Sequence, residues 1–168
     1  LNRVTQVIGG FGTAVAATAT LLYDAADNLL SETTGQSTTA SYAHVSTTSY
    51  GYDALNRVIQ AIEAYGVAGV QRSTQQAFDA AGDLVSQTDG NGNVTSYGFD
   101  ALGRVVQRID GYGSAVASTA TMLYDAASNL LSETTGQSTT ASYAHVSTTS
   151  YGYDALNQLV QQIDGYGT

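Results

Sequence analysis

The sequence predicts an all-β fold built from repeated antiparallel β-hairpins that join into one continuous β strip. Three observations predict it. An aromatic-Asp-Ala motif recurs along the whole chain, short β-branched runs lie between turn-like segments, and 18 glycines punctuate the 168 residues. The motif aspartates are Asp24, Asp53, Asp79, Asp100, Asp125 and Asp154, and the chain opens inside a further copy at residues 1–4.

Two periods are nested in the chain. Residues 1–67 align without gaps on residues 102–168, an offset of 101, with 51 of 67 positions identical. Residues 28–56 recur unchanged as 129–157, and residues 68–101 lie between the copies. The motif aspartates are spaced by 29, 26, 21, 25 and 29 residues, so four units fill each long period. We interpret residues 1–168 as one continuous repeat array and as a piece of a longer one.

Each unit is expected to begin with a turn at its motif aspartate. An Asp at the first position can accept a hydrogen bond from the backbone two residues on, and the fourth position favours a left-handed conformation. Six of the seven residues at this fourth position are Asn, Asp or Gly, which tolerate that conformation, and Ser128 is the exception. The seven are Asn2, Asp27, Asn56, Gly82, Gly103, Ser128 and Asn157.

Strands are predicted on both sides of these turns. After the turns, residues 58–62, 105–109 and 159–163 are short and β-branched. Before them, aromatic-Gly-aromatic triplets place two rings on one face, and the glycine leaves the other face bare for a second layer. In the Ala-rich stretch 14–20, Val and Thr favour strand over helix. Because bulky side chains are sparse, we expect a thin core between closely packed sheets.

A second set of turns is predicted 10 to 13 residues after each motif aspartate, where short tetrapeptides contain Gly or Ser. The tetrapeptides cover residues 9–12, 34–37, 63–66, 89–92, 110–113, 135–138 and 164–167.

Composition excludes several classes of function. The five basic residues are all Arg, against fourteen acids, and the net charge of −9 argues against binding to nucleic acid or to an anionic membrane surface. Without cysteine there is no disulfide, thiolate metal site or nucleophilic thiol. The longest apolar run, residues 14–22, is far short of the roughly 20 residues of a membrane helix.

The motif Tyr-Asp-Ala-x-Gly/Asn-Arg/Leu-Val/Leu, followed by Thr88-Asp89-Gly90-Asn91-Gly92 at a minimum spacing of 21, resembles the RHS or YD-repeat family over essentially the whole chain. The resemblance implies β-hairpins joined into a strip that spirals into a tube or shell, in large secreted or surface proteins of bacteria. The chain departs from the family pattern in its longer units and in having no Pro. It also has no counterpart of the segment that ends toxin shells, so enclosure of a toxin is not carried over.

No constellation of residues predicts catalysis, a cofactor or a metal site. His44 and His145 are one residue seen twice, 101 positions apart, and a metal site needs several converging ligands. The segment 89–100 imitates the start of a calcium loop, but Val94 replaces the required Gly and Asp100 the bidentate Glu, which favours a hairpin turn. No nucleophile elbow is present, and we expect no enzyme activity.

Two features remain open. Phe11, Tyr65, Tyr112 and Tyr166 occupy turn centres, where they either pack against a neighbouring unit or form an exposed row that contacts sugar or another chain. The connectors 38–51 and 139–152 are rich in Ser and Thr. They are interpreted as solvated strands, with O-glycosylation sites as the alternative.

Edge protection is also missing, since natural sheets guard open edges with Lys or Pro and this chain has neither. The leading prediction is a structural protein, a segment of an extracellular or cell-surface β filament, tube or shell wall. Its partners are copies of itself or the continuing chain, and it needs no cofactor. The alternative is a carbohydrate-binding adhesin or toxin-shell segment of a large secreted protein.

Overall fold

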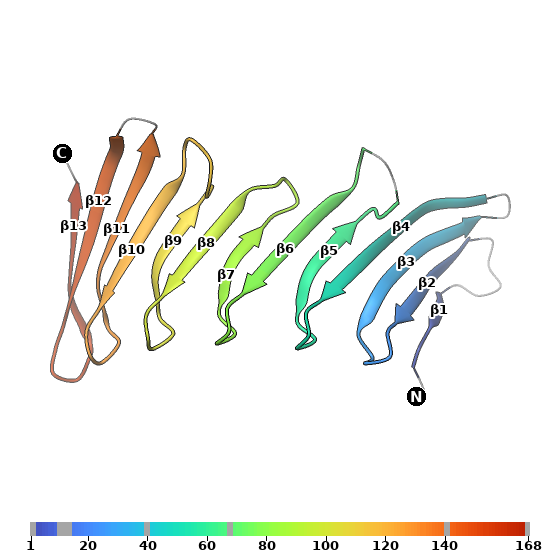
Figure 1. The fold of residues 1–168 in the computed structure, drawn as a ribbon, viewed down its shortest axis with the longest axis horizontal. Helices are drawn as coiled ribbons and strands as arrows, with labels where there is room; N and C mark the ends of the chain where they lie inside the picture. Colours follow the sequence, from blue (N-terminus) through green and yellow to red (C-terminus); the bar gives the residue numbers. More distant parts are fainter. Residues whose placement is uncertain (1–2, 10–14, 39–40, 67–68, 140–141, 167–168) are drawn as a thin grey trace. The chain divides into compact units, whose positions relative to one another are not determined.

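The computed structural model describes residues 3–9, 15–38, 41–66, 69–139 and 142–166, and all regular structure in these ranges is β-strand. The chain divides into two compact units. Unit 1 covers residues 1–76 with 89–92, and unit 2 covers 77–88 with 93–168. The strands, labelled in Figure 1, are β1 (Gln6–Gly9), β2 (Val15–Tyr23), β3 (Leu29–Thr38), β4 (Ser41–Tyr52), β5 (Val58–Glu63), β6 (Arg72–Phe78), β7 (Leu84–Thr88), β8 (Val94–Phe99), β9 (Val105–Asp110), β10 (Ser118–Tyr124), β11 (Leu130–Thr139), β12 (Ser142–Tyr153) and β13 (Leu159–Tyr166).

Each unit is an antiparallel meander in which consecutive strands are neighbours in the sheet. In unit 1 the pairs run from β1·β2 to β5·β6, and in unit 2 from β7·β8 to β12·β13. Among the described strands, no pairing joins the first strand of a unit to its last, so neither meander closes on itself. The predicted class of repeated antiparallel hairpins is confirmed, including strand over helix for residues 15–20.

Within each unit, the motif aspartates start the turns at the same end of its strands (Figure 1). We call residues 24–28, 53–57, 79–83, 100–104, 125–129 and 154–158 the Asp turns and number their positions one to five. The fourth residue is left-handed in all six, with φ between 59° and 99°, as predicted. Its N–H donates to the Asp carbonyl, and the Asp N–H donates to the carbonyl of position five. This is a three-residue hairpin loop closed by a bulge.

The second set of turns is only partly as predicted. Residues 63–66, 89–92 and 110–113 form turns. Residues 34–37 and 135–138 do not, because β3 and β11 continue through them with a register shift at Gly35 and at Gly136. Residues 164–166 are likewise paired with β12, and only Gly9 of the first tetrapeptide is described, in β1. The extra residues of the longer units therefore lengthen the strands, and the Ser/Thr connectors form β4 and β12.

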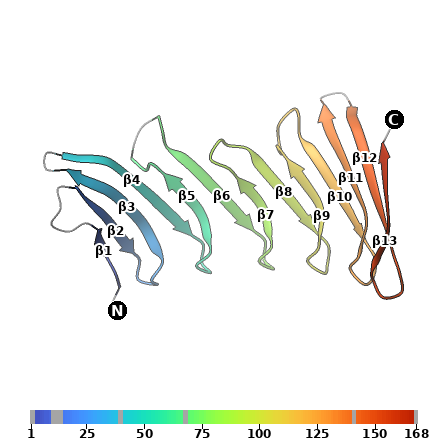
Figure 2. The same cartoon turned by 180° about the vertical axis from the view of Figure 1, so that it is seen from behind.

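The expected core between two sheets is wrong for the described chain. Each unit is a single layer of strands (Figures 1 and 2), and Ala120 is the one buried hydrophobic residue among the described positions. The bare glycine of each aromatic triplet does not admit a second layer either. A Cβ added to Gly51, Gly98 or Gly152 would lie 3.5, 3.4 or 3.2 Å from the Cβ of the cross-strand Gln60, Gln107 or Gln161. The glutamine side chain of the same sheet fills the space above the glycine.

Candidate functional site

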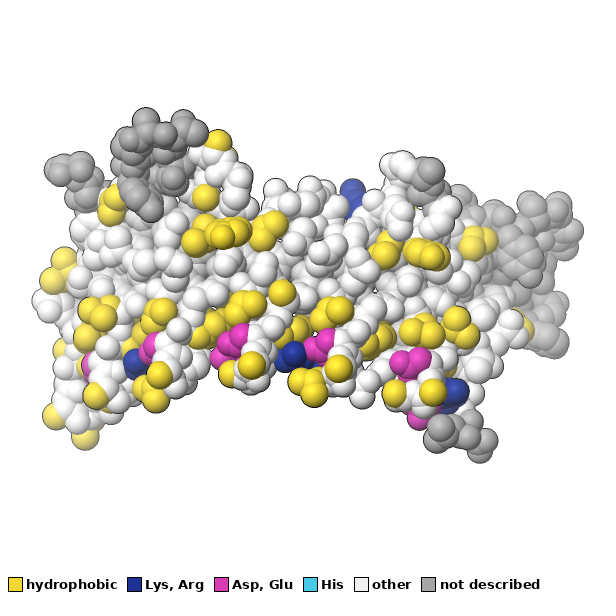
Figure 3. All heavy atoms as spheres, in the orientation of Figure 1, with side chains coloured by type: hydrophobic (Ala, Val, Ile, Leu, Met, Phe, Trp, Pro, Cys, Tyr) yellow, Lys and Arg dark blue, Asp and Glu magenta, His cyan; other side chains and the backbone are white. Residues whose placement is uncertain are grey.

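The Asp turns hold most of the charged side chains (Figure 3) and many of the side-chain hydrogen bonds. Within a turn, one carboxylate oxygen of Asp100 accepts hydrogen bonds from the N–H groups of Leu102 (2.9 Å) and Arg104 (3.0 Å). The other oxygen accepts from Arg104 Nε at 2.7 Å. Asp53 makes the same three bonds. The Asp carboxylate thus supports the turn through both its backbone and the side chain at position five.

These bonds change the acidity of the aspartates. The pKa of Asp100 lies below its usual range, chiefly because the Arg104 side chain donates to it and then because of the Arg104 backbone N–H. For Asp24 and Asp125 the largest cause of a lowered pKa is the side-chain amide of Asn28 or Asn129. For Asp53 it is the backbone N–H of Arg57. The native turn therefore favours the ionised carboxylate at four of its copies.

Position five also reaches forward to the next Asp turn. In unit 2, Arg104 Nη1 donates to the carbonyl of Asp125 (2.9 Å) and to Ser128 Oγ (3.2 Å). In unit 1, Arg3, which is equivalent to Arg104 by the 101-residue offset, donates through Nη1 to the carbonyl of Asp24 (2.6 Å) and to Asp27 Oδ1 (2.7 Å).

Where position five is Asn, the same link is an amide pair. Asn28 Nδ2 donates to Asn56 Oδ1 (2.8 Å), and Asn129 Nδ2 donates to Asn157 Oδ1 (3.0 Å). Ser128, the exception among the left-handed residues, is thereby explained, because its hydroxyl receives the forward hydrogen bond from Arg104.

The motif tyrosines form a second link between successive turns. Tyr52, Tyr124 and Tyr153 donate their hydroxyl groups to the carbonyls of Leu29, Val105 and Leu130, at 3.0, 3.0 and 3.1 Å. Each acceptor is the first residue of the preceding strand. The forward-reaching arginines also cover rings, with Arg104 4.8 Å from the centroid of Tyr124 and Arg3 5.4 Å from that of Tyr23. Consecutive hairpins are therefore joined by side chains as well as by the ladder.

Sequence comparison agrees with this construction. The profile of the RHS repeat matches residues 23–68 and 78–115, which together make up half of the chain. The chain belongs to the RHS-repeat family. A search of curated proteins finds no match.

Among solved structures, a chain of the crystal structure of TcdB2-TccC3-Cdc42 has a similar fold. The TM-score is 0.64 at 19% identity, over 88% of this chain. A chain of the crystal structure of TcdB2-TccC3-TEV aligns with a TM-score of 0.34 at 13% identity, over 95% of this chain. This chain spans 7% and 11% of the length of those two chains. Family and fold together give this RHS-repeat chain a structural role as a β-rich repeat.

The predicted contact aromatics are only partly described. Tyr65 and Tyr112 lie in the turns that follow β5 and β9 and are 55% and 58% exposed. Phe11 lies outside the described residues, as does the side chain of Tyr166 at the end of β13. The side chains of His44 and His145 are also outside the described part. The described residues hold no cluster of three or more His, Cys, Asp or Glu side chains that could bind a metal ion. The same residues contain no helix long and apolar enough to cross a membrane.

The calcium-like segment is a turn, as preferred. Asn91 N–H donates to Asp89 Oδ1 (2.9 Å), Gly92 N–H donates to the Asp89 carbonyl (2.9 Å), and Gly92 is left-handed with φ 85°.

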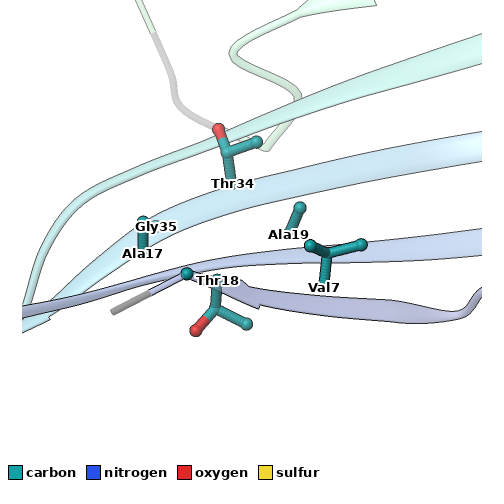
Figure 4. A pocket seen from close by; sticks show the side chains of 7 residues that line it. Val7, Ala17, Thr18, Ala19, Thr34 and Gly35 are labelled. Atoms are coloured by element: carbon teal, nitrogen blue, oxygen red, sulfur yellow. The ribbon is translucent and has the colours of Figure 1, made fainter. Parts of the chain in front are cut away.

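A shallow hollow of about 590 Å³ lies on β1, β2 and β3 (Figure 4). The repeat explains its origin. Val7 and Gly9 in unit 1 correspond to Arg108 and Asp110 in unit 2, where the two side chains form an ion pair beside Ala120. Small residues at the equivalent positions leave the face of unit 1 open. Its lining, which carries no ionisable side chain, is Val7, Gly9, Ala17, Thr18, Ala19, Thr34 and Gly35.

Replacing Arg104 by Lys is expected to lower the melting temperature by about 2–4 °C. An ammonium cannot hold Asp100, the Asp125 carbonyl and Ser128 together, whereas the planar fork of arginine does. Arg108→Lys is the control, because the Arg108 side chain is half exposed and bonds Asp110, two residues along the same strand. Thermal unfolding followed by circular dichroism compares them, and equal losses in the two variants would contradict the forward link.

Removing the hydroxyl group in Tyr52→Phe should destabilise the protein by about 0.5–1.5 kcal/mol, the usual net value of one hydrogen bond. The reverse change, Phe99→Tyr, should stabilise it. Phe99 and Leu84 occupy in unit 2 the same positions of consecutive units as Tyr52 and Leu29. Tyr65→Phe, at an exposed ring, is the control. Urea titration measures the three free energies of unfolding, and destabilisation by Phe99→Tyr would count against the tyrosine link.

Proposed function

We propose that this chain is a wall segment of an extracellular or cell-surface β filament, tube or shell, extended by further hairpins of the same kind. The observation that carries the proposal is the forward link between Asp turns. At position five, Arg104, Asn28 and Asn129 each donate to the aspartate of their own turn and also to a group of the next turn, so these hairpins are completed by their neighbours. One hairpin alone is marginal in water, and arrays gain stability with each added neighbour.

Two further features support extension at the sheet edge. Within unit 2, β13 pairs with β12 as its one partner among the described strands, and Ile163 on β13 is 54% exposed. The chain contains neither Lys nor Pro to block an edge. Copies of the chain, or its continuation, are therefore the proposed partners, in one continuous array over residues 1–168 with no enzyme activity of its own.

Electron microscopy of the purified chain over a range of concentrations tests assembly. Filaments or sheets are expected at high concentration. Ile163→Lys, which places a charge on β13, should reduce them. Leu156→Lys, at the 76% exposed tip of the adjoining Asp turn, adds the same charge outside the strands and should leave them unchanged. Dispersed particles at every concentration would overturn assembly, and immunogold labelling of intact cells tests the surface location.

A second candidate, carbohydrate binding, is favoured by the exposed rings of Tyr65 and Tyr112 at turns. Exposed aromatic rings at turns offer apolar faces that could stack on a sugar. Glycan-array screening is the test, with Tyr112→Ala expected to abolish binding and Tyr52→Phe, a change within the sheet, as the control. An array without any bound glycan would remove this candidate.

A further inference from the structure

The longest identical segment of the chain includes a complete pair of strands in each unit. Residues 28–56 contain β3 and β4, and residues 129–157 contain β11 and β12, without one substitution between them. The registers also agree. Thr33 faces Thr47 in the first pair, and Thr134 faces Thr148 in the second. Backbone pairing alone therefore cannot distinguish β3 from β11, or β4 from β12.

Side-chain contacts across the two pairs are also equivalent. The hydroxyl oxygens of Thr33 and Thr47 are 3.0 Å apart, as are those of Thr134 and Thr148. The tyrosine link recurs as well, from Tyr52 to Leu29 and from Tyr153 to Leu130. So does the amide pair between consecutive Asp turns. A β4 strand placed beside β11 would make every one of these contacts.

Opening such a pair meets little resistance from packing. Ala120 is the one buried hydrophobic residue of the described chain, so the described side chains form no core that holds β3 to β4 or β11 to β12. The strands are held by ladder hydrogen bonds and the side-chain links, and both are recovered in full when an identical strand replaces the original. Repeat proteins are prone to exchange of this kind because their units resemble one another.

We propose that two copies of this chain associate by exchanging these strands, so that β4 of one copy pairs with β11 of the other. Likewise β3 of one copy pairs with β12 of the other. This deepens the proposed function, on which it rests, by naming the partner surface through which copies join. The other junctions differ between the repeats. The forward link runs from Arg3 to Asp27 in the first copy and from Arg104 to Ser128 in the second. Exchange is thus confined to the identical pairs.

Cysteine crosslinking tests the exchange without background, because the natural chain has no cysteine. In Thr47→Cys/Thr134→Cys, each cysteine faces a threonine within its own unit, and the two face each other only when β4 pairs with β11 of another copy. Residues directly opposite in an antiparallel pair have Cα atoms about 4.5–5.5 Å apart, which suits a disulfide. Mild oxidation at rising protein concentration should then give covalent dimers and larger species on a non-reducing gel.

Two variants serve as controls. Thr33→Cys/Thr47→Cys should give a monomer with an internal disulfide, which reports that the unexchanged pair forms. Thr33→Cys/Thr134→Cys places both cysteines on strands of the same type, which never face each other in the exchanged pair. Its disulfides therefore report random collision, and we call it the collision control. The exchange variant, Thr47→Cys/Thr134→Cys, should give at least about fivefold more intermolecular disulfide than the collision control at the same concentration.

Equal crosslinking of the exchange variant and the collision control would overturn the proposed strand exchange. If Thr47→Cys/Thr134→Cys fails to fold by circular dichroism, the reciprocal pair Thr33→Cys/Thr148→Cys decides in its place. Filaments without exchange disulfides would overturn the exchange but leave the proposed wall function standing. Exchange disulfides without filaments would support the strand exchange and overturn the proposed wall function.

Discussion

Acidification from pH 6 to pH 3 is expected to lower the melting temperature. The effect should be large because it acts on several Asp turns at once. The pKa values of Asp24, Asp53, Asp100 and Asp125 are all held below the ordinary value of 3.8 by hydrogen bonds from position five of the same turn. Thermal unfolding by circular dichroism at a series of pH values measures the change.

The direction follows from the lowered pKa values. A carboxyl group whose folded pKa is lower than its unfolded pKa stabilises the fold fully above the unfolded value. That contribution is lost as the pH falls through the folded pKa, so the melting temperature should be level above about pH 5 and should decline below about pH 4.

Replacement of the four aspartates by Asn provides the control. The amide still offers one acceptor oxygen to the turn, but it does not titrate in this range. The variant should be less stable at pH 6 and should lose less than the natural chain on going to pH 3. An equally steep decline in the variant would show that the Asp turns are not the source of the acid sensitivity.

Gly103→Val is expected to destabilise the protein by about 1–3 kcal/mol. Gly103 has φ 73°, and a β-branched side chain is strained in this left-handed region. No atom lies within 4 Å of the position that a Cβ would occupy, so the loss reports backbone strain and not a steric clash. The free energy of unfolding in urea is the measurement.

Gly103→Asn is the matched control, because Asn56 and Asn157 occupy the same position in other Asp turns with φ 60° and 59°. It should be close to neutral. Equal destabilisation by Asn and Val would mean that position four requires the absence of a side chain, and the interpretation of the turn would then be wrong.

The first turn of each unit could be predicted because its physical causes are local. Five consecutive residues contain both signals. The first is an Asp that can accept a hydrogen bond from the backbone two residues on, and the second is a fourth residue that tolerates positive φ. All six described Asp turns have the left-handed fourth residue, but the Asp79 carboxylate accepts from the N–H of Gly82, three residues on, where Asp24, Asp53, Asp100 and Asp154 accept from the N–H two residues on. The second set was less predictable. Residues 34–37 and 110–113 share a Gly at the second position, but the first segment is a bulge inside β3 because β4 is long enough to pair with it.

The links between turns could not be read from any single unit. Arg104 precedes Ser128 by 24 residues, and Tyr52 follows Leu29 by 23. A signal was present in the residues at position five of one turn and position four of the next. Arg3 and Arg104 are followed there by Asp27 and Ser128, and Asn28 and Asn129 are followed by Asn56 and Asn157. It becomes meaningful only once the strand order places those turns side by side.

By itself, the sequence determined the hairpin unit, its period, the left-handed fourth residue and the all-β class, because each depends on the preferences of a few adjacent residues. The tertiary structure decided which side chains form hydrogen bonds between consecutive hairpins. It also decided that each unit is a single layer with the cross-strand glutamines over the glycines, where a second sheet had been expected. Those features depend on strand length and register, which are properties of pairs of strands and not of one segment.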